Sequence, residues 1–124
     1  DNKVQAIVLP GGMPGTLNLE KSPLVQKAID WAVENNKLVC AICAAPSILG
    51  HKGLLDGKKA TCFPGFEEEL FGAEISKDFV IKDGNFITAK GMGSAIEFGL
   101  QIAEILTNPL EVKKIRASLQ IYNG

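Results

Sequence analysis

The stretch LVCAICAAP, residues 38–46, decides the fold of this chain. Its first five residues form a continuous apolar run, which is typical of a strand buried on both faces of a parallel sheet. Pro46 then fits the first turn of a helix, where its missing N–H would have had no partner. Cys43 is therefore expected on a tight turn between a strand and a helix.

This position predicts that Cys43 is a reactive thiol. The N-terminus of a helix presents unpaired N–H groups and a partial positive charge, and both favour a thiolate over a thiol. The arrangement is that of a nucleophile elbow, with sulfur in place of a serine hydroxyl. The simpler interpretation is a small buried hydrophobic residue, as most free cysteines are. The place of Cys43 on the turn favours the reactive interpretation.

Composition limits the possible classes of protein. The chain has 124 residues, enough for one domain with a core. Its net charge of −1 gives no electrostatic basis for binding nucleic acid or an anionic membrane. No apolar run approaches the roughly 20 residues of a membrane span. Three cysteines without a signal-peptide pattern predict free thiols and a cytoplasmic location.

The rest of the chain alternates between strand and helix patterns. This alternation predicts an α/β fold with a mostly parallel sheet. A turn at residues 83–85 predicts a hairpin, and hence some antiparallel pairing. Ser94 and Glu97 are spaced as a capping box for the last long helix. Strands are expected at 4–9, 59–63, 79–82 and 86–89, longer helices at 22–35 and 94–107, and short helices after Pro46, within 65–70 and from Asn108.

Three loops are expected at the carboxyl ends of the strands, where such sheets carry their sites. They span residues 10–15, 43–46 and 89–93. The glycines of the first loop could indicate a phosphate loop, but the G-x-x-x-x-G-K-[ST] spacing is absent. We therefore expect their N–H groups to face the same crevice as Cys43.

Four motifs carry a family resemblance: LPGG at 9–12, AICAAP at 41–46, TCFPGFEE at 61–68 and GMGSAIEFGL at 91–100. With these motifs the chain resembles the DJ-one/ThiJ/PfpI family of the class I glutamine-amidotransferase-like superfamily. The resemblance covers nearly the whole chain. It implies a flavodoxin-like three-layer sandwich and a homodimer.

The resemblance also implies that residues 1–124 are a single domain that is incomplete at its N-terminus. Family members have a strand, a helix and further strands before the LPGG strand. Without them the strand at 4–9 should form an open apolar edge of the sheet, which is an aggregation hazard. We therefore expect a complementary N-terminal fragment of the same protein as a partner.

Several site residues follow from the resemblance. Cys43 matches the reactive cysteine of the family, and Gly12 and Ala44 match positions whose backbone N–H groups face a developing oxyanion. The glutamate that pairs with the cysteine in relatives belongs to their N-terminal segment, before the LPGG strand. Phe63 stands where many relatives have a histidine, which excludes general-base help from that position. Ala44 stands where the protease-like branch has a histidine, which argues against a protease or amidase.

The other cysteines and the only histidine are expected to be structural. Cys40 and Cys43 form a C-x-x-C, but residues three apart on a strand point to opposite faces, which disfavours a redox pair. No second cysteine pair or histidine cluster supports zinc, so no metal is expected. Cys62 is expected to pack at a strand end. His51 follows Cys43 by eight helical residues, about 12 Å, which is too far for a hydrogen bond between them.

The functional hypothesis from the resemblance is a glyoxalase or deglycase that needs no added cofactor. Its substrates would be small α-oxoaldehydes such as methylglyoxal, attacked by Cys43. The alternative is a non-catalytic stress protein or chaperone in which oxidation of Cys43 senses peroxide.

The acidic run Glu67–Glu69 is expected to be a solvated face rather than a metal site.

Overall fold

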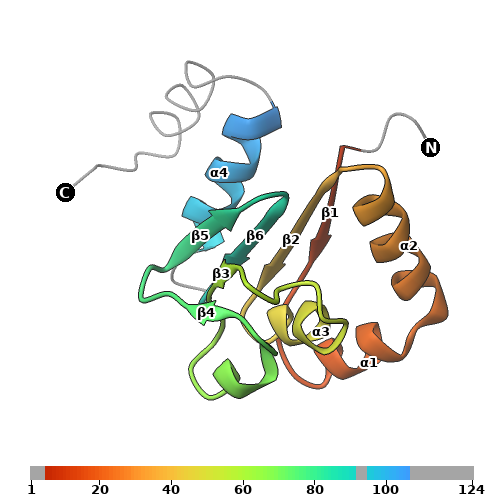
Figure 1. Ribbon diagram of the computed structural model, residues 1–124, viewed down its shortest axis with the longest axis horizontal. Helices are drawn as coiled ribbons and strands as arrows, with labels where there is room; N and C mark the ends of the chain where they lie inside the picture. The colour runs from red at the N-terminus through yellow and green to blue at the C-terminus, as the bar shows by residue number, and fades with distance from the viewer. Residues whose placement is uncertain (1–4, 92–94, 107–124) are drawn as a thin grey trace.

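The computed structural model describes residues 5–91 and 95–106. Strands and helices alternate as the sequence predicts (Figure 1). In chain order the elements are β1 (Ala6–Leu9), α1 (Gly15–Lys21), α2 (Pro23–Glu34), β2 (Leu38–Ile42), α3 (Pro46–His51), β3 (Lys59–Ala60), the 3-10 turn η1 (Glu67–Glu69), β4 (Glu74–Ile75), β5 (Val80–Asp83), β6 (Phe86–Ala89) and α4 (Ala95–Leu106).

The main sheet is mostly parallel, as predicted. Its strand order is β1-β2-β6-β5, and β2 pairs in parallel with both β1 and β6. The predicted hairpin is confirmed by the antiparallel pairing of β5 with β6. Gly84 in its turn has a φ of 60°, a conformation that favours glycine. A second, two-stranded parallel sheet joins β3 to β4.

The two faces of β2 belong to two different apolar cores, which gives the molecule three layers. Every residue of this strand is buried, as its continuous apolar sequence predicts. Val39 and Ala41 pack in a cluster with residues of α2 and α3. Cys40 and Ile42 pack in the other cluster, which contains Phe98 of α4. Helices thus cover both faces of the sheet (Figure 1), and the predicted sandwich is confirmed.

The strand β1 forms one edge of the described sheet. Val8 on this strand is 50% exposed although its neighbour Leu9 is buried. This agrees with the open apolar edge that the sequence predicts for the strand at 4–9. The pairing of that edge with an N-terminal fragment stays a prediction.

The helix α2 begins as its sequence predicts. Ser22 is the N-cap, and its hydroxyl accepts a hydrogen bond from the backbone N–H of Val25 at 3.3 Å. Ile29 and Ala32 are fully buried on its apolar face. This helix therefore packs against the β1–β2 side of the sheet and leads directly into the central strand.

Some expectations differ from the structure. Residues 15–21 form α1, which the sequence did not predict because a glycine loop with few apolar residues is typical of a turn. The strand expected at 59–63 keeps only two residues, since the N–H of Thr61 donates to the hydroxyl of Thr88 at 2.9 Å. The very short β4 was not predicted either. The cap at Ser94 and the helix from Asn108 lie outside the described residues.

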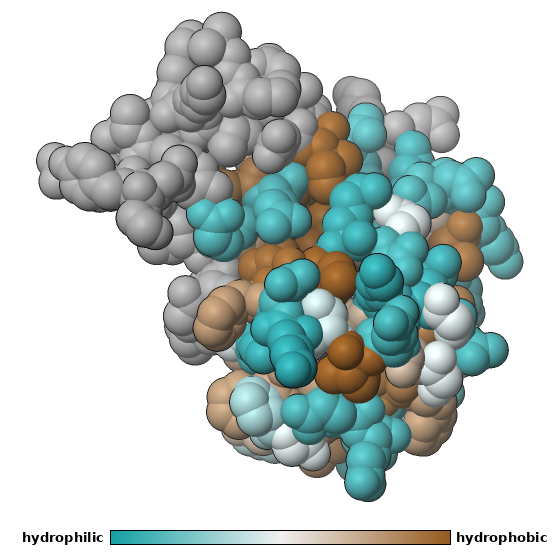
Figure 2. Space-filling view, turned by 60° about the vertical axis from the view of Figure 1, so that its left-hand side comes forward, coloured by the Kyte–Doolittle hydropathy of each residue, from teal (hydrophilic) through white to brown (hydrophobic). Residues whose placement is uncertain are grey.

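On the face that Figure 2 shows, hydrophilic side chains prevail over the described surface, and apolar atoms are visible between them, chiefly in the middle of the face. Among the described residues, no helix has the length and apolar character needed to cross a membrane.

Candidate active site

The site is built around the Cys43 elbow, the turn of residues 42–45 between β2 and α3. Cys43 has a φ of 62°, which costs a non-glycine residue about 1–2 kcal/mol. Its N–H donates to the carbonyl of Ala89 at 3.0 Å, and its carbonyl accepts from the N–H of Phe63 at 2.8 Å. The predicted strand–turn–helix is confirmed, and its strained conformation is held from two sides.

Gly11 allows the first glycine loop to approach this elbow. A Cβ at Gly11 would collide with the Cβ of Cys43 and with the carbonyl oxygen of Ile42. Sequence reasoning missed this role and singled out Gly12, which has a φ of 100°. The pair of glycines directly after a strand was the available signal, because a close backbone approach excludes a side chain.

A cavity of about 310 Å³ opens beside Cys43. Its lining residues are Gly12, Met13, Cys43, Ala44, Phe63 and Phe66. The structure thus brings together the three residues that the sequence predicted for the site. Gly91 lies at the same place, because a Cβ on it would be 3.8 Å from Cys43 Sγ. The first and second predicted loops and the start of the third therefore meet.

The backbone N–H groups of Gly12 and Ala44 donate no hydrogen bond within the described part of the chain. The carbonyl of Gly12 is occupied, since it accepts from both the N–H and the hydroxyl of Thr16 at 2.8 Å. Thr16 is buried and so fixes the glycine loop at the start of α1. The role of these two N–H groups toward an oxyanion stays a prediction.

None of the described residues that line the cavity carries a charged side chain. Phe63 and Phe66 supply aromatic rings, and Met13 supplies a thioether. The ring of Phe63 lies close to Cys43, since a Cβ on Gly91 would be 3.5 Å from Phe63 Cδ1 as well as near the sulfur. The described lining therefore offers a nucleophile in apolar surroundings and no side-chain base.

The other two cysteines are buried on opposite sides of the sheet. Burial raises the pKa of Cys40 to about 12 and, as the largest of several causes, that of Cys62 to about 11. Cys43 is partly exposed, and all three thiols are free. The described residues contain no cluster of three ligands that could hold a metal ion.

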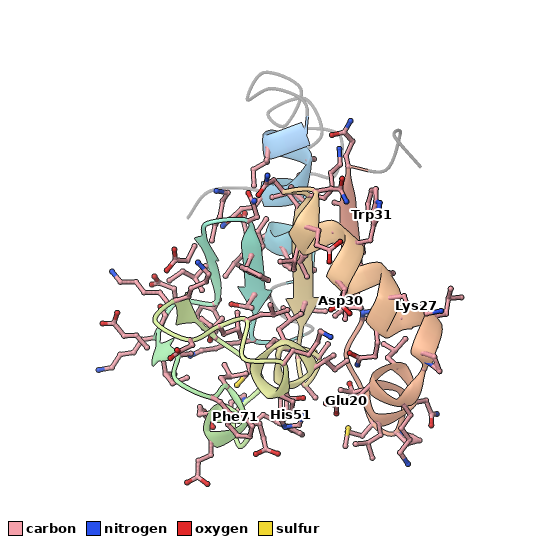
Figure 3. All side chains as sticks on the ribbon, turned by 45° about the vertical axis from the view of Figure 1, so that its right-hand side comes forward. Glu20, Lys27, Asp30, Trp31, His51 and Phe71 are labelled. Carbon is pink, nitrogen blue, oxygen red and sulfur yellow. The ribbon has the colours of Figure 1, made fainter. Side chains whose placement is uncertain are left out.

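His51 lies in a separate group that we call the His51 junction, made of His51, Glu20, Glu69 and Phe71. The ring nitrogens of His51 contact the carboxylate of Glu20 at 2.5 Å and that of Glu69 at 3.3 Å. The ring of Phe71 packs against the ring of His51 (Figure 3), and 5.3 Å separate the two centroids. Burial lowers the pKa of His51, but the hydrogen bonds and charges of both glutamates outweigh it and raise that pKa above its ordinary value.

The His51 junction agrees with the structural role predicted for His51. It corrects one detail, because Glu69 belongs to this ionic group rather than to a purely solvated face. Glu67 and Glu68 are exposed. Glu67 accepts a hydrogen bond from the N–H of Gly65 at 2.8 Å, and hydrogen bonds from the backbone lower its pKa.

Several known proteins are similar to this chain in sequence and in structure. The chain is 36% identical to protein dj-1beta of Drosophila melanogaster over 125 residues, which are 98% of this chain and 67% of that protein. It is 33% identical to the Caenorhabditis elegans glutathione-independent glyoxalase DJR-1.2 over 105 residues, 83% of this chain and 55% of that protein. Oxidized Toxoplasma gondii DJ-1 superposes with a TM-score of 0.91 at 34% identity, covering 98% and 67% of the two chains.

The chain therefore spans between about half and two thirds of the length of these relatives. Longer relatives exist, such as the Arabidopsis thaliana DJ-1 homolog B, of which the match covers 25%. The model of the DJ-1/PfpI family matches residues 1–105, which include every residue that lines the cavity. This chain belongs to the DJ-1/PfpI family.

Proposed function

We propose that this protein is a cysteine-dependent enzyme of the glyoxalase or deglycase type that acts on small α-oxoaldehydes such as methylglyoxal. The observation that carries the proposal is the strained elbow at Cys43, which borders a cavity together with two backbone N–H groups that donate no described hydrogen bond. The name of the nematode relative, a glutathione-independent glyoxalase, supports the same chemistry.

In the proposed reaction the thiolate of Cys43 adds to the aldehyde carbon and forms a carbon–sulfur bond. The aldehyde oxygen becomes an oxyanion, which the N–H groups of Gly12 and Ala44 would stabilise. A proton then moves from the former aldehyde carbon to the neighbouring carbonyl carbon through an enediolate, which leaves a thioester. Water hydrolyses this thioester, so methylglyoxal and one water give lactate and Cys43 is regenerated. The step needs no cofactor and no outside oxidant.

The proton transfer needs a base that the described lining does not supply. The family resemblance places this role on a glutamate in the N-terminal segment of relatives, before the strand that corresponds to β1. We therefore propose a complementary N-terminal portion of the same protein as the partner that completes the site. A homodimer is a further part of this proposal, and it rests on the family resemblance.

The test is lactate formation from methylglyoxal by the protein at its full native length. Wild type should produce lactate, and Cys43→Ser should lower kcat/KM at least about 1,000-fold, the scale for loss of a nucleophile. Cys62→Ala is the matched control, because it removes a buried thiol that does not line the cavity. Equal activity of wild type and Cys43→Ser would contradict the proposal.

A second function is favoured by a specific observation. Cys43 is the one cysteine of the three that is partly exposed, and one structural relative is an oxidized form of its protein. A sensor would convert the thiol to sulfenic or sulfinic acid with peroxide as the oxidant. It predicts a mass increase of one or two oxygens at Cys43 under mild peroxide, together with no lactate formation by the wild type.

A further inference from the structure

The cavity beside Cys43 has an apolar lining, although the proposed substrate carries two carbonyl groups. Its side chains are Met13, Phe63, Phe66, the methyl group of Ala44 and the thiol itself. Gly12 and Ala44 also line the cavity, and their backbone N–H groups donate no hydrogen bond to the described residues. Beside the thiol and these two residues, the described lining offers a ligand apolar side chains.

The two phenylalanines are fixed relative to the nucleophile. The N–H of Phe63 donates to the carbonyl of Cys43 at 2.8 Å, and the N–H of Phe66 donates to the carbonyl of Phe63 at 3.2 Å. The turn that carries both rings is thus attached to the elbow. A ligand bonded to the sulfur would therefore lie in a cavity that both phenylalanines line.

Phe63 and Met13 have exposed apolar surface that a ligand in the cavity could cover. Phe63 is 50% exposed and Met13 is 54% exposed, although both line a cavity. An aryl or branched alkyl group held there would remove apolar surface from water on both partners. An aryl group would also meet an aromatic ring at its edge or face. Such aromatic pairs are more stable than the apolar area they bury would predict.

We propose that the preferred substrates are α-oxoaldehydes with a bulky apolar substituent, aryl or branched alkyl, and that Phe63 and Phe66 determine this specificity. The inference rests on the proposed function, because it needs attack by Cys43 on the aldehyde. The chemistry is unchanged: the aldehyde carbon is oxidised to a carboxylate, the ketone is reduced to an alcohol, and water is consumed. Phenylglyoxal would give mandelate.

The experiment compares kcat/KM for phenylglyoxal and methylglyoxal in the protein at its full native length, with mandelate and lactate as readouts and Cys43→Ser as the blank. The ratio of the two kcat/KM values should exceed about tenfold in favour of phenylglyoxal, the lower end of what one added apolar group is worth in a pocket. Phe63→Ala and Phe66→Ala should each lower this ratio about tenfold, chiefly through a higher KM for phenylglyoxal.

Phe79→Ala is the matched control, since Phe79 is a 70% exposed phenylalanine that does not line the cavity. It should leave the ratio unchanged, and because each ratio is taken within one variant, losses of folded protein cancel. Turnover of methylglyoxal with equal or lower kcat/KM for phenylglyoxal would overturn the inference and leave the proposed function standing. A ratio that survives both cavity substitutions would overturn it too. Absence of Cys43-dependent turnover of either aldehyde would overturn the proposed function itself.

Discussion

The Cys43 elbow and the His51 junction join the same three segments of the chain, residues 11–20, 43–51 and 63–69, by opposite means. At the elbow, Gly11 approaches Cys43 through backbone contact, and Phe63 donates a backbone hydrogen bond to it. At the junction, Glu20 of α1 contacts His51 through its carboxylate (Figure 3), and so does Glu69 of η1.

The charged contacts that stabilise the fold and the residues that line the candidate site lie in different places. The charged groups that tie α1 to η1 lie at the surface, and the cavity beside the thiol has no charged side chain in its described lining. A nucleophile in apolar surroundings interacts strongly with the few dipoles aimed at it, because little else screens them. Backbone geometry is tight at the elbow, where a Cβ on Gly11 would collide with the Cβ of Cys43 and where Cys43 has a positive φ.

The largest effect at the elbow is expected from Gly11→Ala. The added methyl group would collide with backbone and Cβ atoms of residues 42 and 43, so the nucleophile must move. A misplacement of this kind costs about 100-fold in turnover, and overpacking costs about 1–3 kcal/mol in the free energy of unfolding. Lactate formation and urea unfolding measure the two effects.

Gly15→Ala is the control for this substitution. Gly15 lies a few residues further along the same chain segment, and a Cβ there meets nothing within 4 Å. Both turnover and stability should stay close to those of the wild type. If Gly11→Ala behaved as Gly15→Ala does, the close approach at the elbow would not matter for the function.

A smaller effect is expected when the strain at Cys43 is relieved. Cys43→Gly and Cys43→Ala both remove the sulfur, but only glycine adopts a φ of 62° without strain. The glycine variant should therefore be the more stable one, by about 1 kcal/mol in the free energy of unfolding. At Ala45, where φ is −62°, replacement by glycine should instead destabilise by about 0.5–1 kcal/mol. The same sign at both positions would contradict the strain at the elbow.

The smallest effect concerns the His51 junction and depends on pH. Because the pKa of folded His51 lies above its ordinary value of about 6.5, protonated His51 stabilises the fold fully below that value. The stabilisation is lost as the pH rises through the raised folded pKa. The unfolding free energy of wild type should exceed that of His51→Gln at about pH 6, by less than about 1 kcal/mol for these partly exposed pairs, and the difference should shrink by about pH 8.

Glu20→Gln provides the control for the junction, since it removes the closer of the two carboxylates. In that background the substitution of His51 should show a weaker dependence on pH, measured by urea unfolding at both pH values. A stability difference that grows toward the higher pH would show that the folded protein favours neutral His51. None of these variants should change the ratio of the two aldehyde activities, because the junction does not line the cavity.

The sequence predicts the elements that carry their own local pattern. The run at 38–42 is apolar at every position, and Ser22-Pro23 is a strong helix start, so β2 and α2 are where they were expected. The hairpin of β5 and β6 follows from its turn residues. Strand ends in a parallel sheet share one edge, which is why the loops around Cys43 were expected to meet. The family resemblance indicated Gly12 and Ala44 as site residues, and both line the cavity with Cys43.

Other features depend on contacts between distant residues, which no local pattern encodes. His51 meets Glu20 across 31 positions of sequence, and β3 ends early because Thr88 offers a hydroxyl to the backbone of Thr61. The close approach of Gly11 and the place of Phe66 in the cavity likewise emerge only when the loops are brought together. The helix α1 was missed because its short sequence has no apolar stripe to distinguish it from a loop.

The most direct test of the central claim is the rate at which iodoacetamide alkylates each cysteine, mapped by peptide mass spectrometry with and without methylglyoxal. Cys43 should be labelled at least about 100-fold faster than Cys40 and Cys62, since burial raises the pKa of those two thiols to about 12 and about 11. Methylglyoxal should slow the labelling of Cys43 alone, because the aldehyde occupies the same sulfur. Labelling of Cys43 that is no faster than that of the buried thiols, or that methylglyoxal leaves unchanged, would contradict the assignment of Cys43 as the nucleophile.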